Sequence, residues 1–170
     1  NLGDNFDDLA GSTGSGSWDV WNELNGWSSA GAGIEIQTDN TIGQVDAQDG
    51  EHYVELASHG AADSNSAMKQ AIDFSAGTYV LSFYYSPRTG TLGDNGIVFG
   101  VDGVFKNIVS GPTNDLKRGE WTEVTQTFTV DAGIKSLFFS AEPGGSSTLG
   151  GLIDNVSIEA VPLPASSLLL

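Results

Sequence analysis

Apolar and polar residues alternate along most of the chain from about Ile34 onward, with a period of two residues. In the segment GIEIQ, Ile34 and Ile36 fall on one side of an extended chain, and Glu35 and Gln37 fall on the other. This alternation is typical of β-strands that turn one face toward a hydrophobic core. It predicts a protein built mainly from strands.

Several later segments show the same pattern, namely HYVELAS, TYVLSFYYS, GIVFGVDGVFKNIVS, WTEVTQTFTV, IKSLFFSAE and GLIDNVSIEAV. The third of them predicts a hairpin around Asp102–Gly103, because Asp-Gly is a preferred two-residue turn. The segment AADSNSAMKQAIDF contains good helix formers, but its second half leads into the turn SAGT and is expected to be a strand. The first thirty residues read as rich in loops.

These patterns predict one all-β domain over residues 1–160. Short strands separated by Gly-rich and Asp-rich turns are typical of a sandwich, so we expect a jelly-roll β-sandwich of roughly eight or nine antiparallel strands. No segment predicts a long helix. An apolar tail, VPLPASSLLL, covers residues 161–170 and is treated as a separate unit.

Charge and cysteine content narrow the possible functions. The 170 residues include 22 Asp and Glu against 6 Lys and Arg, which gives a formal charge of −16. Nucleic acids and anionic membranes attract basic surfaces, so neither is an expected partner. The acidic balance favours hard cations such as Ca²⁺. The chain has no cysteine, which excludes disulfides and thiol nucleophiles and favours an exported protein.

Asp154 is the strongest chemical signal in the sequence. In GLIDNVSIEA, strict alternation places Asp154 on one face with Leu152, Val156 and Ile158. A carboxylate on an apolar face is costly unless a cation or several hydrogen-bond donors meet it. Two interpretations follow: a Ca²⁺ ion held by oxygen ligands, or hydrogen bonds from backbone amides at the rim of the sheet.

Four segments together resemble the jelly-roll superfamily of carbohydrate-binding modules and related domains of secreted bacterial proteins. They are NFD at 5–7, Trp27 at the start of a strand, DGEHY at 49–53 and DNV at 154–156, in this order. The resemblance covers most of residues 1–160. It implies a β-sandwich that binds glycan or peptide ligands.

The resemblance also implies a structural Ca²⁺ site. In that superfamily the N-terminal acid and the aspartate of the final strand share the ion, so Asp7 and Asp154 would supply side chains here. Asp49 and Glu51 would lie close by. The superfamily more often has Glu where this chain has Asp7, which shortens the reach by one methylene.

Candidate ligand-binding residues are Trp18, Trp21, Tyr84 and Arg88. Indole rings in a segment rich in Gly, Ser and Asp offer flat apolar faces on which sugars stack, although both tryptophans could instead cover one end of the sandwich. Tyr84 alternates away from its apolar neighbours and is expected on the opposite face of its strand. Arg88 could bind a carboxylate of a uronic acid or peptide end, or could fix its own loop.

Segments such as GSWDVWNELNGW and YSPRTG also look like modules of large marine bacterial adhesins, some of which bind peptide termini or sugars through Ca²⁺. Motifs for a serine nucleophile, a dinucleotide loop or a zinc protease are not found. Acidic residues occur throughout, so a glycosidase pair cannot be recognised, and six cations offer little to a polysaccharide lyase. We therefore expect a non-catalytic protein.

The tail VPLPASSLLL resembles the opening of a PEP-CTERM-type sorting signal, in the variant that begins VPLPA. The resemblance implies export to the surface or extracellular matrix of a Gram-negative bacterium. An alternative use of the tail is self-assembly, in which Leu163, Leu168, Leu169 and Leu170 pair with a neighbouring copy. The sequence therefore predicts a Ca²⁺-stabilised, secreted adhesion or biofilm-matrix protein that binds polysaccharide or peptide, or a self-assembling subunit of a filament or matrix layer.

Overall fold

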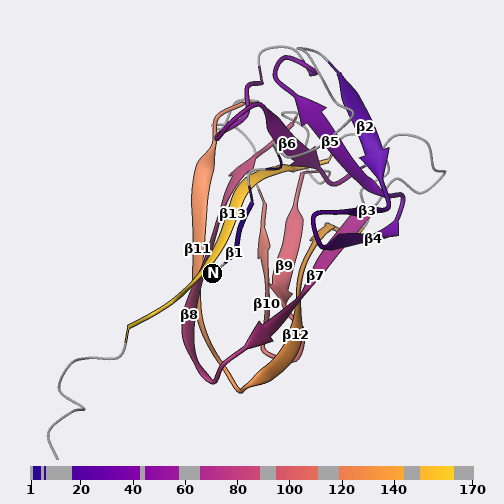
Figure 1. The fold of residues 1–170 in the computed structure, drawn as a ribbon. Helices are drawn as coiled ribbons and strands as arrows, with labels where there is room; N and C mark the ends of the chain where they lie inside the picture. The colour runs from indigo at the N-terminus through magenta and orange to yellow at the C-terminus, as the bar shows by residue number, and fades with distance from the viewer. Residues whose placement is uncertain are drawn as a thin grey trace, which may run out of the picture.

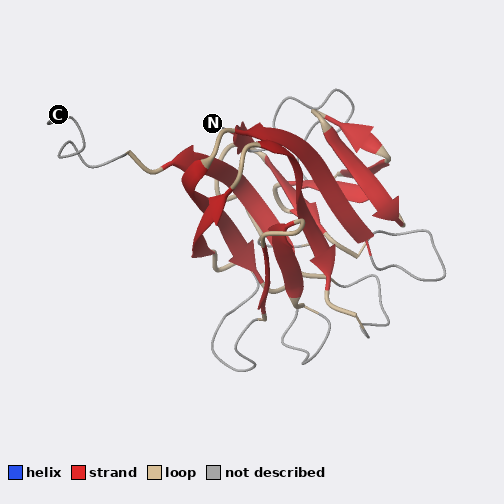
Figure 2. Ribbon diagram, turned by 90° about the horizontal axis from the view of Figure 1, so that it is seen from below, coloured by secondary structure: helices blue, strands red, loops and turns tan. Residues whose placement is uncertain are grey.

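The structure is a computed structural model. It describes residues 2–4, 6, 17–42, 45–57, 66–88, 95–110, 119–143 and 150–162, with the backbone alone for residues 2–4. The predicted residues Asp7, Leu163, Leu168, Leu169 and Leu170 lie outside this part of the chain. The described residues form strands and turns, and they contain no helix (Figure 2).

Thirteen strands are described, and they form two antiparallel sheets (Figure 1). The seven-stranded sheet has the order β11-β8-β13-β6-β5-β2, and β1 pairs with β13 beside this path. Its strands are β1 (Leu2–Asp4), β2 (Trp18–Trp21), β5 (Ile34–Thr38), β6 (His52–Glu55), β8 (Gly77–Ser86), β11 (Thr122–Val130) and β13 (Leu152–Ala160).

The six-stranded sheet has the order β10-β9-β12-β7-β4-β3. Its strands are β3 (Glu23–Leu24), β4 (Trp27–Gly31), β7 (Ser66–Phe74), β9 (Ile97–Val101), β10 (Phe105–Val109) and β12 (Gly133–Ala141). The predicted hairpin around Asp102–Gly103 is confirmed as the turn between β9 and β10, with Gly103 at a φ of 72°. The second half of AADSNSAMKQAIDF is also confirmed as a strand.

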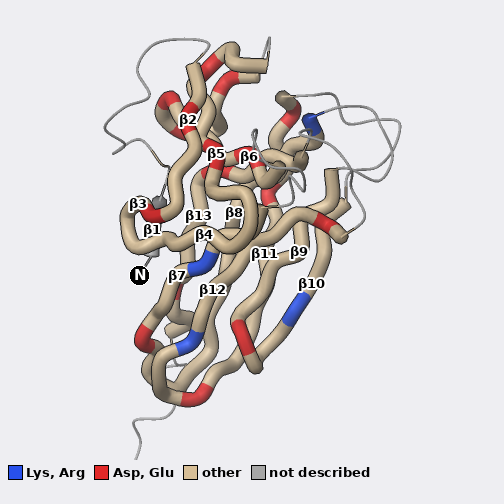
Figure 3. The backbone as a smooth tube through the Cα atoms, turned by 90° about the vertical axis from the view of Figure 1, so that its right-hand side faces the viewer, with Lys and Arg blue, Asp and Glu red and all other residues tan. Residues whose placement is uncertain are grey.

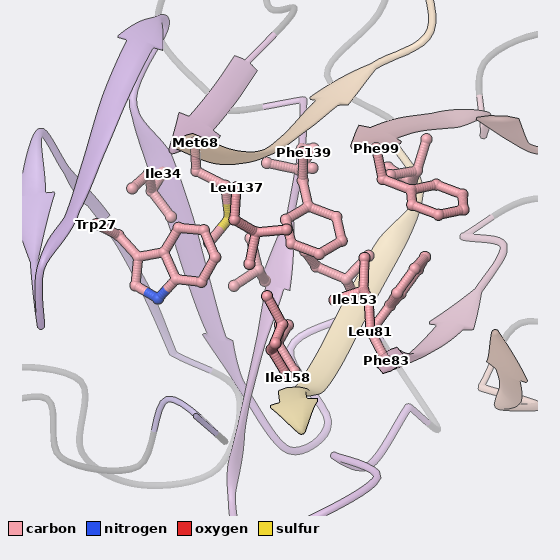
Figure 4. Close-up of a cluster of buried hydrophobic side chains, with 14 of the residues drawn as sticks. Trp27, Ile34, Met68, Leu81, Phe83, Phe99, Leu137, Phe139, Ile153 and Ile158 are labelled. Atoms are coloured by element: carbon pink, nitrogen blue, oxygen red, sulfur yellow. The ribbon is translucent and has the colours of Figure 1, made fainter. Parts of the chain in front are cut away.

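The two sheets pack face to face around one main hydrophobic core, which confirms the predicted β-sandwich (Figure 4). Trp27 begins β4 and is buried against Phe139, with ring centroids 5.9 Å apart. Phe83 of the other sheet lies 5.0 Å from the same Phe139 ring. Edge-to-face contacts of this kind join the two sheets, because the positive edge of one ring meets the negative face of another.

The number of strands is higher than the eight or nine predicted. The difference arises mainly in the first thirty residues, which contain β1, β2, β3 and the start of β4. These strands are two to five residues long, so they are too short to show a period of two.

The predicted assignment of the side chains of the last strand to its two faces is wrong. A β-bulge between Asp154 and Ser157, with Asn155 at a φ of 48°, resets the alternation of β13. Val156 joins the main core, whereas Leu152 belongs to a second cluster on the outer face of the seven-stranded sheet. An extra residue in one strand shifts every later side chain to the other face. Asp154 is therefore buried, but outside the sandwich core.

Within the described residues, none forms a helix of the length and apolar character that a membrane span requires. The strand β13 ends at Ala160, and the next residue, Val161, is 42% exposed.

Candidate functional site

The outer face of the seven-stranded sheet is covered where β5 and β6 lie. Every residue of these two strands is buried, including the polar ones. A second hydrophobic cluster explains the cover: Val45, Tyr53 and Leu152 are fully buried, and Ile42, Ala47 and Trp121 pack against them. The connection between β5 and β6 therefore folds back over the sheet, and this places the polar residues of both strands in a low-dielectric environment.

Four polar side chains meet under this cover and are called here the buried polar cluster: Glu35, Gln37, Glu55 and Arg88. The Nε2 atom of Gln37 donates to Glu35 Oε1 at 2.8 Å and also to Glu55 Oε2. Arg88 donates from Nη1 to Glu55 Oε1, and the two side chains form an ion pair with exposures of 13% and 0%. One guanidinium thus pairs with Glu55, and Gln37 links Glu55 to the second buried carboxylate, Glu35.

Glu55 is the centre of this cluster. Burial raises the pKa of Glu55 from 4.5 to about 7; the contact with Arg88 opposes the rise, and Glu35 adds to it. The amide N–H of Gly150 also donates to Glu55 Oε1, at 2.9 Å. Because the pKa lies near neutrality, the cluster can hold or release one proton in the physiological range.

The cluster also fixes the structured ends of nearby connections. Arg88 follows β8, and its backbone N–H donates to Asn95 Oδ1 at 3.0 Å. The Tyr85 hydroxyl donates to the carbonyl of Asn95 at 2.7 Å, and the N–H of Gly119 donates to Ser86 Oγ at 3.1 Å. Residues that flank two connections are therefore held against the end of β8.

An exposed indole ring lies directly beside the cluster. Trp18 on the edge strand β2 pairs with Gln37, so both side chains lie on the same face, and Trp18 is 48% exposed. Gln37 in turn pairs with Tyr53. The Gln37 Oε1 and Tyr53 hydroxyl atoms are buried without a hydrogen-bond partner. The row across the sheet therefore runs from an exposed aromatic ring to two polar groups that are buried and unsatisfied.

Desolvation raises the pKa of Tyr53 above its ordinary value, with Glu55 as the second cause. The phenol therefore stays protonated and can both donate and accept a hydrogen bond. Its ring meets Trp121 edge-on, with centroids 5.9 Å apart, and Trp121 Nε1 donates to the carbonyl of Asp46 at 2.9 Å.

Three of the four residues predicted to bind a ligand lie on the outer face of the seven-stranded sheet. Trp18 is exposed, Tyr84 is half-buried opposite Asp154, and Arg88 is paired with Glu55. Arg88 thus fixes its own loop, one of the two roles considered for it, through a strand residue rather than a local aspartate. Trp21 lies on the other side of β2, packed against the main core, and its Nε1 is buried without a partner.

The environment of Asp154 agrees with the second interpretation of this residue. Its Oδ2 accepts hydrogen bonds from the backbone N–H groups of Gln48 at 2.8 Å and Asp49 at 3.0 Å, and Oδ1 accepts from Asn155 at 2.6 Å. Burial nevertheless raises the pKa of Asp154 to about 7. Three donors therefore offset only part of the cost of burying this carboxyl group.

The described residues do not complete the predicted Ca²⁺ site. Asp49 and Glu51 are exposed, and among the residues that the structure describes no three acidic, histidine or cysteine side chains converge. Asp7, the second predicted ligand, lies outside these residues. The calcium site stays a prediction.

Sequence reasoning missed Glu35, Gln37 and Glu55 as members of one cluster. The alternation in GIEIQ correctly puts Glu35 and Gln37 on the face away from the core. It does not show that a second layer covers that face. The available signal was the hydrophobic content of the connection after β5, since Ile42 and Val45 need a surface to pack against.

Comparisons with known proteins agree with the fold. No protein-family model matches the chain, and no curated protein does. Among solved structures, the chain is similar to the carbohydrate-binding module TmCBM61 in complex with β-1,4-galactotriose, with a TM-score of 0.58 and 20% identity over 82% of this chain and 92% of that one. A likeness at this identity establishes the jelly-roll sandwich fold.

Parts of larger proteins are also similar. An exo-β-1,3-galactanase from Phanerochaete chrysosporium, solved with β-1,3-galactotriose, matches with a TM-score of 0.52 and 16% identity over 87% of this chain and 30% of that one. The mosquito-larvicidal Cry4Aa toxin from Bacillus thuringiensis matches with a TM-score of 0.51 and 13% identity over 80% and 22%. The chain thus spans less than a third of each of these two proteins.

Proposed function

We propose that the chain is a non-catalytic glycan-binding module of an exported bacterial surface or matrix protein. The observation that carries the proposal is the exposed Trp18 ring beside the buried polar cluster. A pyranose ring stacks on an indole through its apolar C–H face. The fold shared with a galactotriose-binding module supports this reading.

The buried polar cluster does not contact the ligand itself. It holds the residues around the Trp18 surface in a fixed arrangement. Arg88 and Gly150 are both held by Glu55, so the residues around the end of β6 keep one arrangement before a ligand arrives. Fewer groups then lose conformational freedom on binding, which favours affinity. The tail residues and the acidic surface support export and a role in adhesion or biofilm matrix as parts of the same proposal.

The proposal is tested with a glycan array followed by calorimetry on any glycan that binds. We expect saturable binding that falls about fivefold or more in Trp18→Ala, since stacking on one ring contributes on the order of 1 kcal/mol or more. The matched control is Ile134→Ala, because Ile134 is the most exposed of the large hydrophobic residues described, at 73%, and lies on the other sheet. Equal affinity of wild type and Trp18→Ala would contradict the proposal.

A structural Ca²⁺ ion shared by Asp7 and Asp154 is part of the proposal. The burial of Asp154 supports it, because a cation would offset the cost of a buried carboxylate that its three amide donors only partly meet. We expect a chelator to lower the melting temperature of the wild type and to leave that of Asp154→Asn unchanged. A wild-type midpoint that does not respond to chelator would overturn the calcium assignment and leave the glycan site untouched.

A further inference from the structure

The lysines of this acidic protein gather on one sheet. The described residues contain one arginine, Arg88, and three lysines, Lys69, Lys106 and Lys135. The lysines belong to β7, β10 and β12 of the six-stranded sheet, which faces the viewer in Figure 3. Within the described part of the chain Arg88 forms an ion pair, whereas the three lysines form none.

Two of these lysines flank an aromatic ring on the outer face of the sheet. Phe138 of β12 pairs with Lys69 on one side and with Gly100 on the other, and Gly100 pairs with Lys106. Directly paired residues point to the same face, so Lys106, Phe138 and Lys69 form one row. Lys135, three residues before Phe138, points to the opposite face.

Gly100 leaves room for the ring in this row. A Cβ atom at Gly100 would lie 2.9 Å from Cζ of Phe138 and 2.2 Å from the carbonyl oxygen of Phe105. Any larger residue would therefore displace the Phe138 ring and the hairpin backbone. The glycine lets the half-buried ring lie low between the two exposed lysines.

A surface pocket opens at the end of this row. It has a volume of about 340 Å³, and Asp102, Val104, Lys106 and Phe138 are among the residues that line it. This is the size of a small ligand site. The pocket thus combines an aromatic wall, a cation and a carboxylate that can accept a hydrogen bond from a hydroxyl group.

We propose that this face is a second glycan site, specific for polysaccharides that carry carboxylate or sulfate groups. A sugar ring packs on Phe138, and its anionic groups meet Lys106 and, along the row, Lys69. Asp73, Asp102 and Glu23 are among the acidic residues on the same face, and they disfavour an anion placed beside them. Glu23 pairs with Ser28, which pairs with Lys69, so Glu23 ends the same row and an anion is favoured at the Lys106 side of Phe138. An anionic group is therefore expected near the lysine row, with neutral hydroxyls toward Asp102.

The alternative occupant of the face is the acidic surface of a second copy of the chain. The Phe138 ring beside Lys106 in this shallow pocket favours a sugar, because it gives a pyranose an apolar face next to a cation. The proposed site lies on the opposite sheet from Trp18, so it does not depend on the first glycan site.

The experiment measures binding to polygalacturonate as the carboxylated polymer, dextran sulfate as the sulfated polymer and dextran as the neutral one. We expect the wild type to bind at least one anionic polymer and Lys106→Gln to lose about fivefold to tenfold in affinity, with a further loss in the double variant Lys69→Gln/Lys106→Gln. The matched control is Lys135→Gln, which makes the same charge change on the other face. The control and Trp18→Ala should keep wild-type affinity for the anionic polymer.

Two results would overturn the proposal. In one, all lysine variants, Lys135→Gln included, lose affinity equally, which would indicate general charge attraction. In the other, anionic polymers do not bind, and sedimentation shows that Lys106→Gln abolishes self-association of the wild type; the face would then be a protein interface. Binding to polygalacturonate would indicate carboxylate groups as the source of negative charge, and binding to dextran sulfate would indicate sulfate groups.

Discussion

The outer faces of the two sheets have similar sequence patterns and opposite environments. On β5, Glu35 and Gln37 alternate with core residues, and on β7, Lys69 and Asp73 do the same. The first pair is buried on the face that carries the second hydrophobic cluster, whereas Lys69 and Asp73 are exposed. An alternating strand shows which residues leave the core, and the packing of a distant segment decides whether they reach water.

This difference in exposure determines what a charged side chain contributes on each face. Under the cover, Glu55 needs Arg88, Gln37 and Gly150 as partners, because an unpaired buried charge is costly. On the exposed face, the lysines stay hydrated and carry no such requirement. Charges on the covered face should therefore affect stability, and charges on the open face should affect binding.

Removal of the buried cation should produce the largest effect. Arg88→Met leaves Glu55 without its guanidinium partner, and we expect the free energy of unfolding at pH 7.5 to fall by about 4 kcal/mol. Urea denaturation measures this change. The matched control is Lys106→Met on the open face, with an expected change within about 0.5 kcal/mol. Similar losses in both variants would contradict the comparison.

Ionisation of Glu55 on the covered face should change the free energy of unfolding by an intermediate amount. The folded pKa of Glu55, about 7, lies above its ordinary value of 4.5, so the folded chain binds this proton more tightly than the unfolded chain. The resulting stabilisation is complete below about pH 4.5 and is lost as the pH rises through 7. We expect a contribution of up to about 3 kcal/mol between these limits.

Thermal or urea unfolding of wild type and Glu55→Gln between pH 4.5 and 8 isolates this contribution. The decrease with rising pH should be smaller in Glu55→Gln, because the amide does not titrate. Glu123→Gln is the control, since Glu123 lies exposed on the same sheet. An identical pH slope in wild type and Glu55→Gln would show that Glu55 is ionised throughout this range.

The smallest effect is expected from an apolar residue on the open face. Ile134 is 73% exposed on β12, so Ile134→Thr removes little buried surface and keeps a β-branched side chain. The free energy of unfolding should change by less than about 0.5 kcal/mol in urea denaturation. A loss above 2 kcal/mol would show that a partner covers this face as well.

The fold could be predicted from the sequence because its longest strands carry strong alternation. In β8, Leu81, Phe83 and Tyr85 are buried as expected. The buried polar cluster could not be predicted in the same way. Glu35 and Glu55 are separated by twenty residues in the sequence, and their pairing depends on strand register and on the hydrophobic cover. The bulge at Asn155 could not be predicted from the alternation of apolar and polar residues either, because one added residue leaves no local signature in the sequence.

The place of β13 in the sheet has a mechanical consequence. This strand lies between β8 and β6 and also pairs with β1; it begins beside Glu55 and ends at Ala160, where the described chain leaves the sandwich (Figure 1). A force applied between the two ends of β13 would run along the strand. The hydrogen bonds to β8 would then bear the force together in shear, instead of opening one after another. A strand loaded in this way separates only when many hydrogen bonds break at once.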